Sequence, residues 1–190
     1  MKSNQNQMTE KQKMLNGQYY HAFDQDLLKD RQRAKGLCQK LNSIPDASQE
    51  ERVKIIKDLF QTDRNCWIES PFRCDYGYNI QIGDNFYANF GCVILDCNIV
   101  KIGSNVKLGP NVQIYTATHP INVTERMAGK EMAYPIEIGD NVWIGGSCII
   151  LPGLKIGNNT VIGAGSVVTK DISENVVAVG NPCHVIKEIE

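Results

Sequence analysis

His119 is the residue of this sequence whose type and place most directly suggest catalysis. It lies in the stretch QIYTATHP (113–120), where a β-like run is stopped at once by Pro120. An imidazole titrates near neutral pH and is the side chain most often used as a general base. A lone histidine beside a loop is more commonly a surface residue, so its role depends on the elements that position it. The other two histidines, His21 and His184, have no such context.

The bulk composition gives no sign of a nucleic-acid or membrane partner. The chain has 190 residues and a formal net charge of −1, and its basic residues are scattered. No apolar run reaches membrane-spanning length, and the polar N-terminal stretch lacks the apolar centre of a signal peptide. The seven cysteines form no CxxC pair and no Cys/His zinc spacing, which favours buried thiols in a reducing compartment. We therefore expect a cytoplasmic protein.

The first third of the chain has helical periodicity. Thr9 and Gln12 form a capping-box pattern at the start of a short helix. Apolar residues then recur at helical spacing over residues 24–41, and Pro45 ends that stretch. A second capping-box pattern, at Ser48 and Glu51, predicts a third helix.

A six-residue repeat replaces this periodicity after about residue 65. Its unit is an aliphatic residue, a glycine, two small or polar residues and often a valine. The IGDN-type hexamers at 138 and 156 are eighteen residues apart, so three strands make one turn of a triangular prism with aliphatic side chains inside. Glycine is expected to supply the corner conformations that other residues avoid. We predict a helical segment over 1–64 and a mainly β coiled domain over 65–190, with repeats at IGDNFY (82–87), IGSNVK (102–107), LGPNVQ (108–113), IGDNVW (138–143), IGGSCI (144–149), IGNNTV (156–161) and IGAGSV (162–167).

Two interruptions break the repeat. Residues 120–135 carry no hexapeptide signal, and Ile102 and Ile138 are thirty-six residues apart, so about one coil's length is expelled as a loop. A long loop without secondary structure is uncommon in a compact domain and is usually functional. His119 directly precedes this loop. A second interruption, a slip of two residues, falls around residues 96–98.

Several motifs resemble those of the maltose and galactoside O-acetyltransferases, the maltose branch most closely. Besides the repeats they are FRCDYGYNI (72–80), FYANF (86–90), YTATHP (115–120), DNVWIGG (140–146), VIGAGSVVTKDI (161–172) and GNPCHVIKEI (180–189). The resemblance covers almost the whole chain. It implies a left-handed parallel β-helix, an exception to the right-handed crossover rule, and a homotrimer with active sites between subunits. It also implies acetyl-CoA as the donor and a hydroxyl of a sugar such as maltose or glucose as the acceptor, with no metal required.

The resemblance implies a role for each of several residues in direct acetyl transfer. His119 would be the general base that deprotonates the sugar hydroxyl while both substrates are bound. The backbone N–H of Gly146 would face the developing oxyanion. The implied acceptor contacts come from Asp75, Asn89, Cys97, Asp24 and Tyr87, with Asp96 as an alternative to Cys97.

The acceptor residues also have structural interpretations. Asn89 fits a turn, Asp75 fits a solvated loop acid, and Tyr87 fits simple packing. The galactoside enzymes carry an acid at the position of Cys97, which argues against galactoside specificity.

The implied donor site combines small residues, which leave room for the pantetheine arm, with cations for its phosphates. The matching positions are Gly146, Ala164, Thr169, Lys170, His184 and Lys187. The repeat itself requires small residues, and the lysines also fit a solvated face. His184 stands where relatives often carry arginine. Trp143 fits either a wall of the active site near His119 or an exposed residue at the subunit interface.

Three rival functions share parts of this pattern. The same base and donor site would serve another acceptor, such as an amino sugar, an antibiotic or a galactoside. A zinc hydratase on the same fold needs three histidine ligands, and the positions of His21 and His184 argue against it. A non-catalytic trimeric scaffold is compatible with the repeats alone, but not with the placement of His119 at the edge of the expelled loop.

Overall fold

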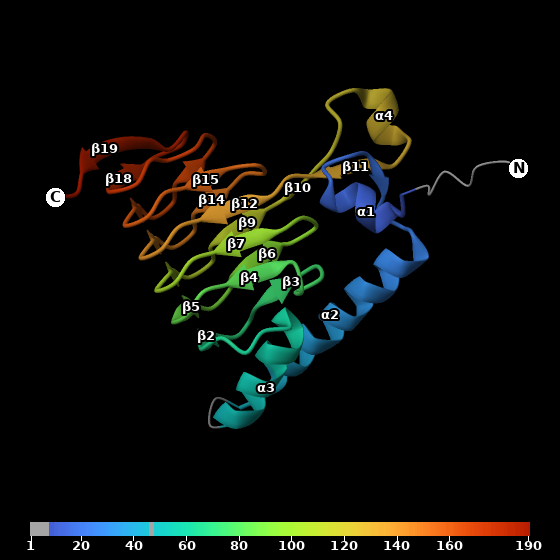
Figure 1. The fold of residues 1–190 in the computed structure, drawn as a ribbon, viewed down its shortest axis with the longest axis horizontal. Helices are drawn as coiled ribbons and strands as arrows, with labels where there is room; N and C mark the ends of the chain where they lie inside the picture. Colours follow the sequence, from blue (N-terminus) through green and yellow to red (C-terminus); the bar gives the residue numbers. More distant parts are fainter. Residues whose placement is uncertain (1–7, 46–47) are drawn as a thin grey trace, which may run out of the picture.

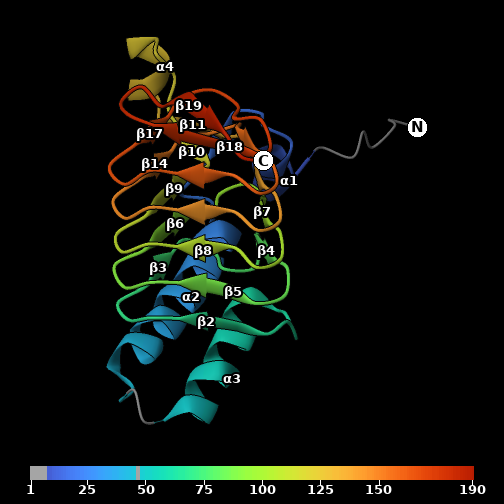
Figure 2. The same cartoon turned by 90° about the vertical axis from the view of Figure 1, so that its left-hand side faces the viewer.

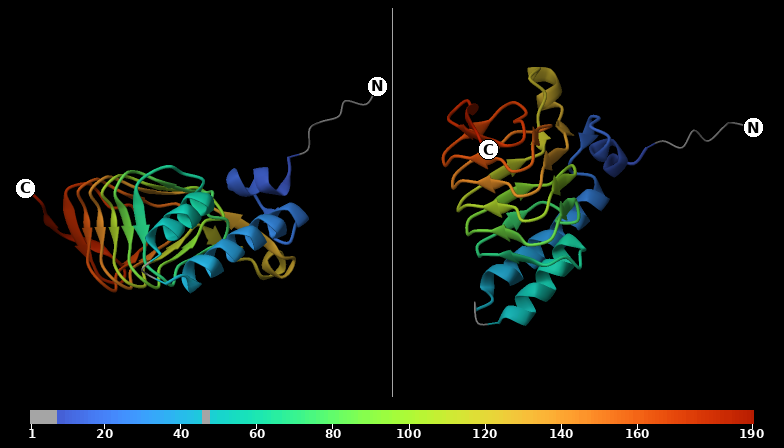
Figure 3. Two further views of the ribbon diagram at one scale, coloured as in Figure 1. Left: turned by 90° about the horizontal axis from the view of Figure 1, so that it is seen from below. Right: turned by 60° about the vertical axis from the view of Figure 1, so that its left-hand side comes forward.

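The N-terminal helices cover one end of a stack of short strands. The computed structural model describes residues 8–45 and 48–190. Thr9 and Gln12 form the expected capping box. The prediction of a capping box at Ser48 is wrong, because the Ser48 side chain makes no hydrogen bond to the helix that follows it. The helices are α1 (Glu10–Leu15), α2 (Gln25–Ser43) and α3 (Gln49–Phe60), and α2 and α3 lie across the end of the coil in Figures 1 and 3.

The repeats form a parallel β-helix with three flat faces, as the eighteen-residue period predicts. The chain visits the faces in the order 1, 2, 3, and the rungs stack one above another in Figure 2. Face 1 holds β4 (Ile80–Ile82), β7 (Val100–Ile102), β12 (Ile136–Ile138) and β15 (Lys155–Ile156). Face 2 holds β2 (Cys66–Ile68), β5 (Phe86–Ala88), β8 (Lys107–Leu108), β13 (Trp143–Ile144), β16 (Val161–Ile162), β18 (Val176–Val179) and the antiparallel β19 (His184–Glu188). Face 3 holds β3 (Arg73–Cys74), β6 (Val93–Leu95), β9 (Gln113–Tyr115), β14 (Ile149–Ile150) and β17 (Val167–Val168).

The register confirms both interruptions of the repeat. Ile102 pairs with Ile82 on one side and with Ile138 on the other, although the sequence separations are twenty and thirty-six residues. The inward residues Ile82, Ala88 and Ile94 are spaced six apart, whereas Ile102 comes eight residues after Ile94, so the two-residue slip falls between β6 and β7. The inward aliphatic residues are buried in one core, which the apolar sides of α2 and α3 also enter. The proposed division at residues 64 and 65 falls between α3 and β2, and residues on both sides of it share this core.

The corner between faces 1 and 2 depends on asparagine rather than on glycine conformation, which corrects the sequence interpretation. Asn85, Asn105, Asn141, Asn159 and Asn175 all adopt the left-handed conformation. Each of the first four donates its side-chain N–H to the side-chain oxygen of the next, over 3.1, 3.0, 2.9 and 2.8 Å. The repeat glycines serve close approach instead, because a Cβ on Gly103 would lie 2.6 Å from the carbonyl carbon of Gly139.

The expelled segment is structured, contrary to the expectation of a loop without secondary structure. It forms an arm, residues 117–135, which contains β10 (Ala117–Thr118), α4 (Val123–Met127) and β11 (Lys130–Ala133). The strand β11 pairs antiparallel with both β10 and β1 (Tyr20–His21), so the arm and the N-terminal segment form one three-stranded sheet. Figure 1 shows the arm projecting from the coil beside α1. No helix in the described ranges is long and apolar enough to cross a bilayer.

Candidate active site

His119 follows β10 at the edge of the three-stranded sheet, with its side chain exposed. Thr118 lies opposite Met132, so the next pair in the register places His119 opposite Glu131. Glu131 in turn lies opposite Tyr20 on the other side of β11. Directly opposed residues of antiparallel strands carry their side chains on the same face of a sheet. Tyr20, Glu131 and His119 therefore form a row across the sheet, which we call the Tyr–Glu–His row.

The Tyr–Glu–His row faces a buried polar cluster at the corner between faces 3 and 1. Cys97 donates its thiol proton to Asp75 Oδ2 over 3.4 Å. Burial raises the pKa of Asp75 and the pKa of Cys97 above their usual ranges. Burial also raises the pKa of Glu131, against the opposing charges of His119 and Arg31. The carboxyl groups of Asp75 and Glu131 thus sit in a partly dehydrated site, where their interactions with a cation or a hydroxyl are stronger than in water.

Asp96 supports this cluster from beneath. Its side chain is fully buried, and Oδ1 accepts hydrogen bonds from the backbone N–H groups of Asp75 and Tyr76, each over 2.9 Å. Oδ2 has no hydrogen-bond partner among the described residues. Burial, with the charge of Asp75 adding to it, raises the pKa of Asp96 to about 7. These contacts make Asp96 a support for the Asp75 turn, with no surface available to an acceptor in this chain.

Asp96 should make the protein less stable as the pH rises. The folded state holds a proton up to about pH 7, whereas an unfolded aspartate releases it near pH 4. The contribution of protonated Asp96 to the free energy of unfolding is therefore fully present below about pH 4 and is lost as the pH rises through about 7. We expect the free energy of unfolding, measured by urea denaturation, to fall less between pH 5 and pH 8 for Asp96→Asn than for wild type. An unchanged fall in the variant would contradict this account.

Asp24 has a clear structural task. It is the N-cap of α2, where its side chain accepts hydrogen bonds from the N–H groups of Asp26 and Leu27. Capping of this kind stabilises a helix start by about 1 kcal/mol. The sequence interpretation gave Asp24 an acceptor contact, and the cap leaves its carboxylate already engaged.

The remaining predicted acceptor residues lie at the opposite edge of face 3. Asn89 occupies the corner between faces 2 and 3, and its side-chain oxygen accepts the N–H of Phe90 over 2.8 Å. Tyr87 lies on face 2, where Lys107 of the next rung separates it from Trp143, two rungs away. The Trp143 side chain is 57% exposed. A large exposed aromatic on a flat face is typical of a surface that another molecule covers.

The predicted donor residues are divided between both edges. Gly146 and Ala164 stack at the corner between faces 2 and 3, whereas Thr169 and Lys170 lie at the corner between faces 3 and 1, as His119 does. His184 and Lys187 lie on the exposed strand β19 at the end of face 2, and His184 Nδ1 lies 3.1 Å from the carbonyl oxygen of Pro182.

One chain therefore carries two half-sites. We call the group with His119, Asp75, Cys97, Thr169 and Lys170 the histidine edge, and the group with Asn89, Gly146 and Ala164 the glycine edge. Face 3 lies between them.

Three residues of the site, Tyr20, Arg31 and Glu131, have no counterpart in the sequence interpretation. Tyr20 is buried beside Cys97 and Glu131, and burial raises the pKa of its hydroxyl. Arg31 donates to the hydroxyl of Tyr76 over 2.7 Å and also to the carbonyl oxygen of Ala22, which ties α2 to this corner. The signal that could have found Glu131 is the sequence KEMA after Gly129, which is long enough to pair with the strand before His119.

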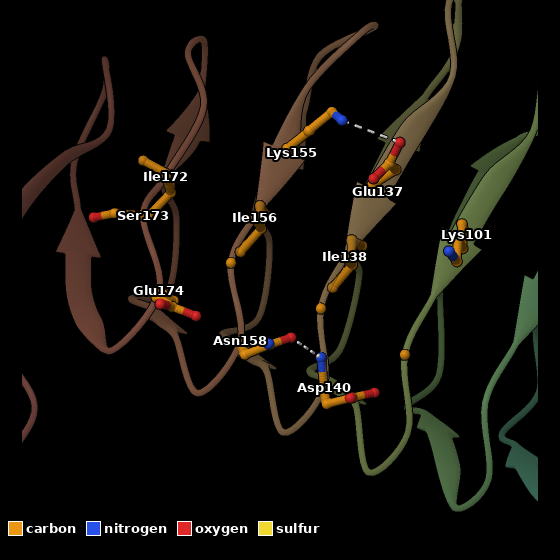
Figure 4. Close-up of a pocket in the computed structure, with 13 residues that line it drawn as sticks. Lys101, Glu137, Ile138, Asp140, Lys155, Ile156, Asn158, Ile172, Ser173 and Glu174 are labelled. Atoms are coloured by element: carbon orange, nitrogen blue, oxygen red, sulfur yellow. Dashed lines mark hydrogen bonds and ion pairs between the residues drawn. The ribbon is translucent and has the colours of Figure 1, made fainter.

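A groove on face 1 contains none of the predicted site residues. Figure 4 shows that lysines and carboxylates from successive rungs line it, and Lys155 pairs there with Glu137 over 3.3 Å. In the described ranges no group of three or more His, Cys, Asp or Glu side chains is arranged to hold a metal ion.

Comparison with known proteins decides the family. Residues 13–63 match the maltose acetyltransferase hexapeptide capping motif, and residues 135–170 match the bacterial transferase hexapeptide family (six repeats). A solved maltose O-acetyltransferase from Clostridium difficile 630 is 54% identical, with a TM-score of 0.94 over 97% of this chain and 100% of that one. The chain belongs to the hexapeptide-repeat acetyltransferases. Membership confirms the resemblance seen in the motifs and assigns acyltransferase activity.

Two further relatives of this hexapeptide-repeat acetyltransferase were solved with coenzyme A or acetyl coenzyme A bound. A galactoside acetyltransferase solved in complex with coenzyme A is 44% identical, with a TM-score of 0.93 over 97% of this chain and 92% of that one. A hexapeptide-repeat acetyltransferase from Vibrio cholerae O1 biovar eltor, solved with acetyl coenzyme A, is 33% identical. Its TM-score is 0.89 over 96% of this chain and 100% of that one.

Proposed function

We propose that this acetyltransferase moves an acetyl group from acetyl-CoA to a hydroxyl of a sugar such as maltose or glucose. The observation that carries the proposal is the Tyr–Glu–His row, which aligns an exposed imidazole with a half-buried carboxyl beside Asp75 and Cys97. The Clostridium difficile relative is a maltose O-acetyltransferase, and two other relatives were solved with coenzyme A or acetyl coenzyme A.

In the proposed mechanism His119 acts as the general base. It takes the proton of the sugar hydroxyl as the oxygen attacks the thioester carbonyl, and it returns a proton to the sulfur of CoA as the C–S bond breaks. A base that is also held in place by a carboxyl needs no reorientation during the reaction. Glu131 is the positioning residue in this scheme, because it lies opposite His119 in the register and its charge interacts with the imidazole. Tyr20 fills the third position of the row and limits the movement of Glu131.

Asp75 and Cys97 are the proposed acceptor contacts on the histidine edge. The Asp75 carboxylate can accept a sugar hydroxyl while it still holds the Cys97 thiol. A buried acceptor of this kind rejects analogues that lack the matching hydroxyl. Cys97 offers only a weak thiol where galactoside enzymes carry an acid, so we expect weaker use of galactosides than of maltose or glucose. Asn89 and Tyr87 would approach the acceptor from the glycine edge.

The donor would lie along the glycine edge. There the backbone N–H of Gly146 is available to the oxyanion, and Gly146 and Ala164 leave space beside the backbone for the pantetheine arm. A set of exposed residues would contact the rest of CoA: Trp143, Thr169, Lys170, His184 and Lys187.

We propose a homotrimer because the two edges must meet. The half-sites lie on opposite sides of face 3, so a complete site requires the histidine edge of one subunit to face the glycine edge of the next. Rotation of such a head-to-tail contact closes as a ring.

The proposed function is tested by release of free CoA thiol with a panel of acceptors. We expect kcat/KM for maltose or glucose to exceed that for a galactoside by at least about tenfold, because the position of Cys97 lacks the acid. Deoxy sugars that lack one hydroxyl serve as matched controls for each acceptor. Acetyl-CoA binding without thiol release for any sugar in the panel would contradict the acceptor class.

A further inference from the structure

Two cysteines from different elements meet between α2 and face 3. Cys38 lies in α2 and Cys74 ends β3, and their Sγ atoms are 3.7 Å apart in a sulfur–sulfur hydrogen bond. Their side chains are 3% and 6% exposed. The acetyl transfer proposed above uses neither thiol. A disulfide needs an S–S distance of about 2 Å, so only a small approach of α2 to β3 separates the pair from a covalent bond.

The pair is open to small solutes. A cavity of about 700 Å³ lies beside the two cysteines, and its lining includes Lys35, Arg73 and Asp75. Buried cysteines are normally inert because reagents do not reach them. Here the cavity gives a small oxidant a path to both sulfur atoms.

The two thiols differ in acidity, in the way that a reactive pair requires. The hydrogen bond shared with Cys74 lowers the pKa of Cys38 against the effect of burial, and the positive charge of Arg73 lowers it further. The same hydrogen bond and burial raise the pKa of Cys74. The thiolate is the nucleophilic form of cysteine, so Cys38 is the attacking sulfur and Cys74 is its proton-bearing partner.

We propose that Cys38 and Cys74 form a reversible disulfide in response to a hydroperoxide. The Cys38 thiolate attacks the O–O bond of hydrogen peroxide and takes one oxygen as a sulfenic acid, and the other oxygen leaves as water. The Cys74 sulfur then displaces the sulfenic hydroxyl, which leaves as a second water with the Cys74 proton. Two thiols are oxidised by two electrons in total, and one peroxide is reduced to two waters. A dithiol reductant reverses the bond by thiol–disulfide exchange.

The disulfide would act on the acceptor site through Asp75. Asp75 follows Cys74 directly in the chain, and its carboxylate holds the thiol of Cys97. Drawing Cys74 toward α2 moves Asp75 away from the position that it shares with Cys97, and small misplacements of a positioning group reduce rates strongly. This effect on the acceptor rests on the proposed function, whereas the disulfide itself does not.

The test is peptide mapping after hydrogen peroxide treatment of the full chain and alkylation of the remaining thiols. We expect a peptide pair joined through Cys38 and Cys74, which dithiothreitol separates. Cys38→Ser should abolish the crosslink. Cys92→Ser, which removes another buried thiol of the coil, should retain it. Oxidation of the half-buried Cys66 without a Cys38–Cys74 crosslink would overturn the proposal, as would a crosslink between other cysteines.

Kinetics test the coupling separately. We expect oxidation to lower kcat/KM for the sugar about tenfold or more in wild type and not in Cys38→Ser, with recovery after reduction. A mapped crosslink with unchanged kinetics would refute the coupling to Asp75. If no sugar is acetylated at all, the proposed function fails, but the mapped crosslink and a higher Tm of the oxidised protein still test the disulfide.

Discussion

His119→Ala should lower kcat for sugar acetylation by about two to four orders of magnitude, the usual contribution of a general base. The imidazole is exposed at the histidine edge and has no structural hydrogen bond among the described residues, so its loss should leave the fold intact. The measurement is steady-state thiol release with saturating acetyl-CoA, together with Tm. A variant with wild-type kcat would remove His119 from the mechanism.

Two further variants separate base chemistry from local structure. His21→Ala is the matched control, because His21 is an exposed histidine on β1 of the same three-stranded sheet, next to Tyr20 and therefore on the opposite face. It should retain kcat within about threefold, as surface substitutions usually do. Glu131→Gln keeps the size of the positioning residue and removes its charge, so kcat should fall about 10- to 100-fold while KM for acetyl-CoA stays constant. Equal losses in Glu131→Gln and His21→Ala would indicate a structural effect of the sheet.

The coil was predictable from the sequence because its constraint is local and repeated. Each rung needs inward aliphatic residues and, after faces 1 and 2, usually a glycine where the next rung approaches, so the sequence carries the same signal in successive rungs. The slip at residues 96–98 could also be predicted, because a two-residue insertion between Ile82 and Ile102 breaks the six-residue spacing of the inward residues. The cause assigned to glycine was wrong at the corner between faces 1 and 2, where asparagine fills the left-handed position and its side chain gains a hydrogen bond to the next rung. At the other two corners Gly91, Gly153 and Gly165 do adopt the left-handed conformation.

Only part of the candidate site could be predicted from the sequence, for a different physical reason. His119 was noticed because a proline ends its strand, which is a local signal. Glu131 lies opposite His119 through the pairing of β10 with β11 inside the arm. Tyr20 joins them only through antiparallel pairing between β1 and β11, across more than a hundred residues of sequence. No periodicity within the arm records that pairing. The division into two edges follows from the order in which the chain visits the faces, and spacing alone did not associate His119 with one edge and Asn89 with the other.

Co-expression of two inactive variants should restore activity if the site lies between subunits. His119→Ala disables the histidine edge, and Asn89→Ala disables the glycine edge. When the two chains assemble at random in equal amounts, about a quarter of all contacts join two intact edges, which is the product of two one-in-two chances. Each variant alone should give almost no acetylated sugar, so the expected gain is large. Different tags on the two chains verify that both are present in equal amounts, and the whole assembled population is assayed without separation of its trimers.

The matched control places both substitutions on one chain and co-expresses it with wild type. A site between subunits again leaves about a quarter of the contacts intact, so both mixtures should have the same activity. A site within one chain would leave the first mixture inactive and the control with about half of the wild-type activity. The rate of sugar acetylation by the co-assembled His119→Ala and Asn89→Ala chains is therefore the most direct test of an active site between subunits. We predict about a quarter of the wild-type rate, and a rate no higher than that of either variant alone would contradict it.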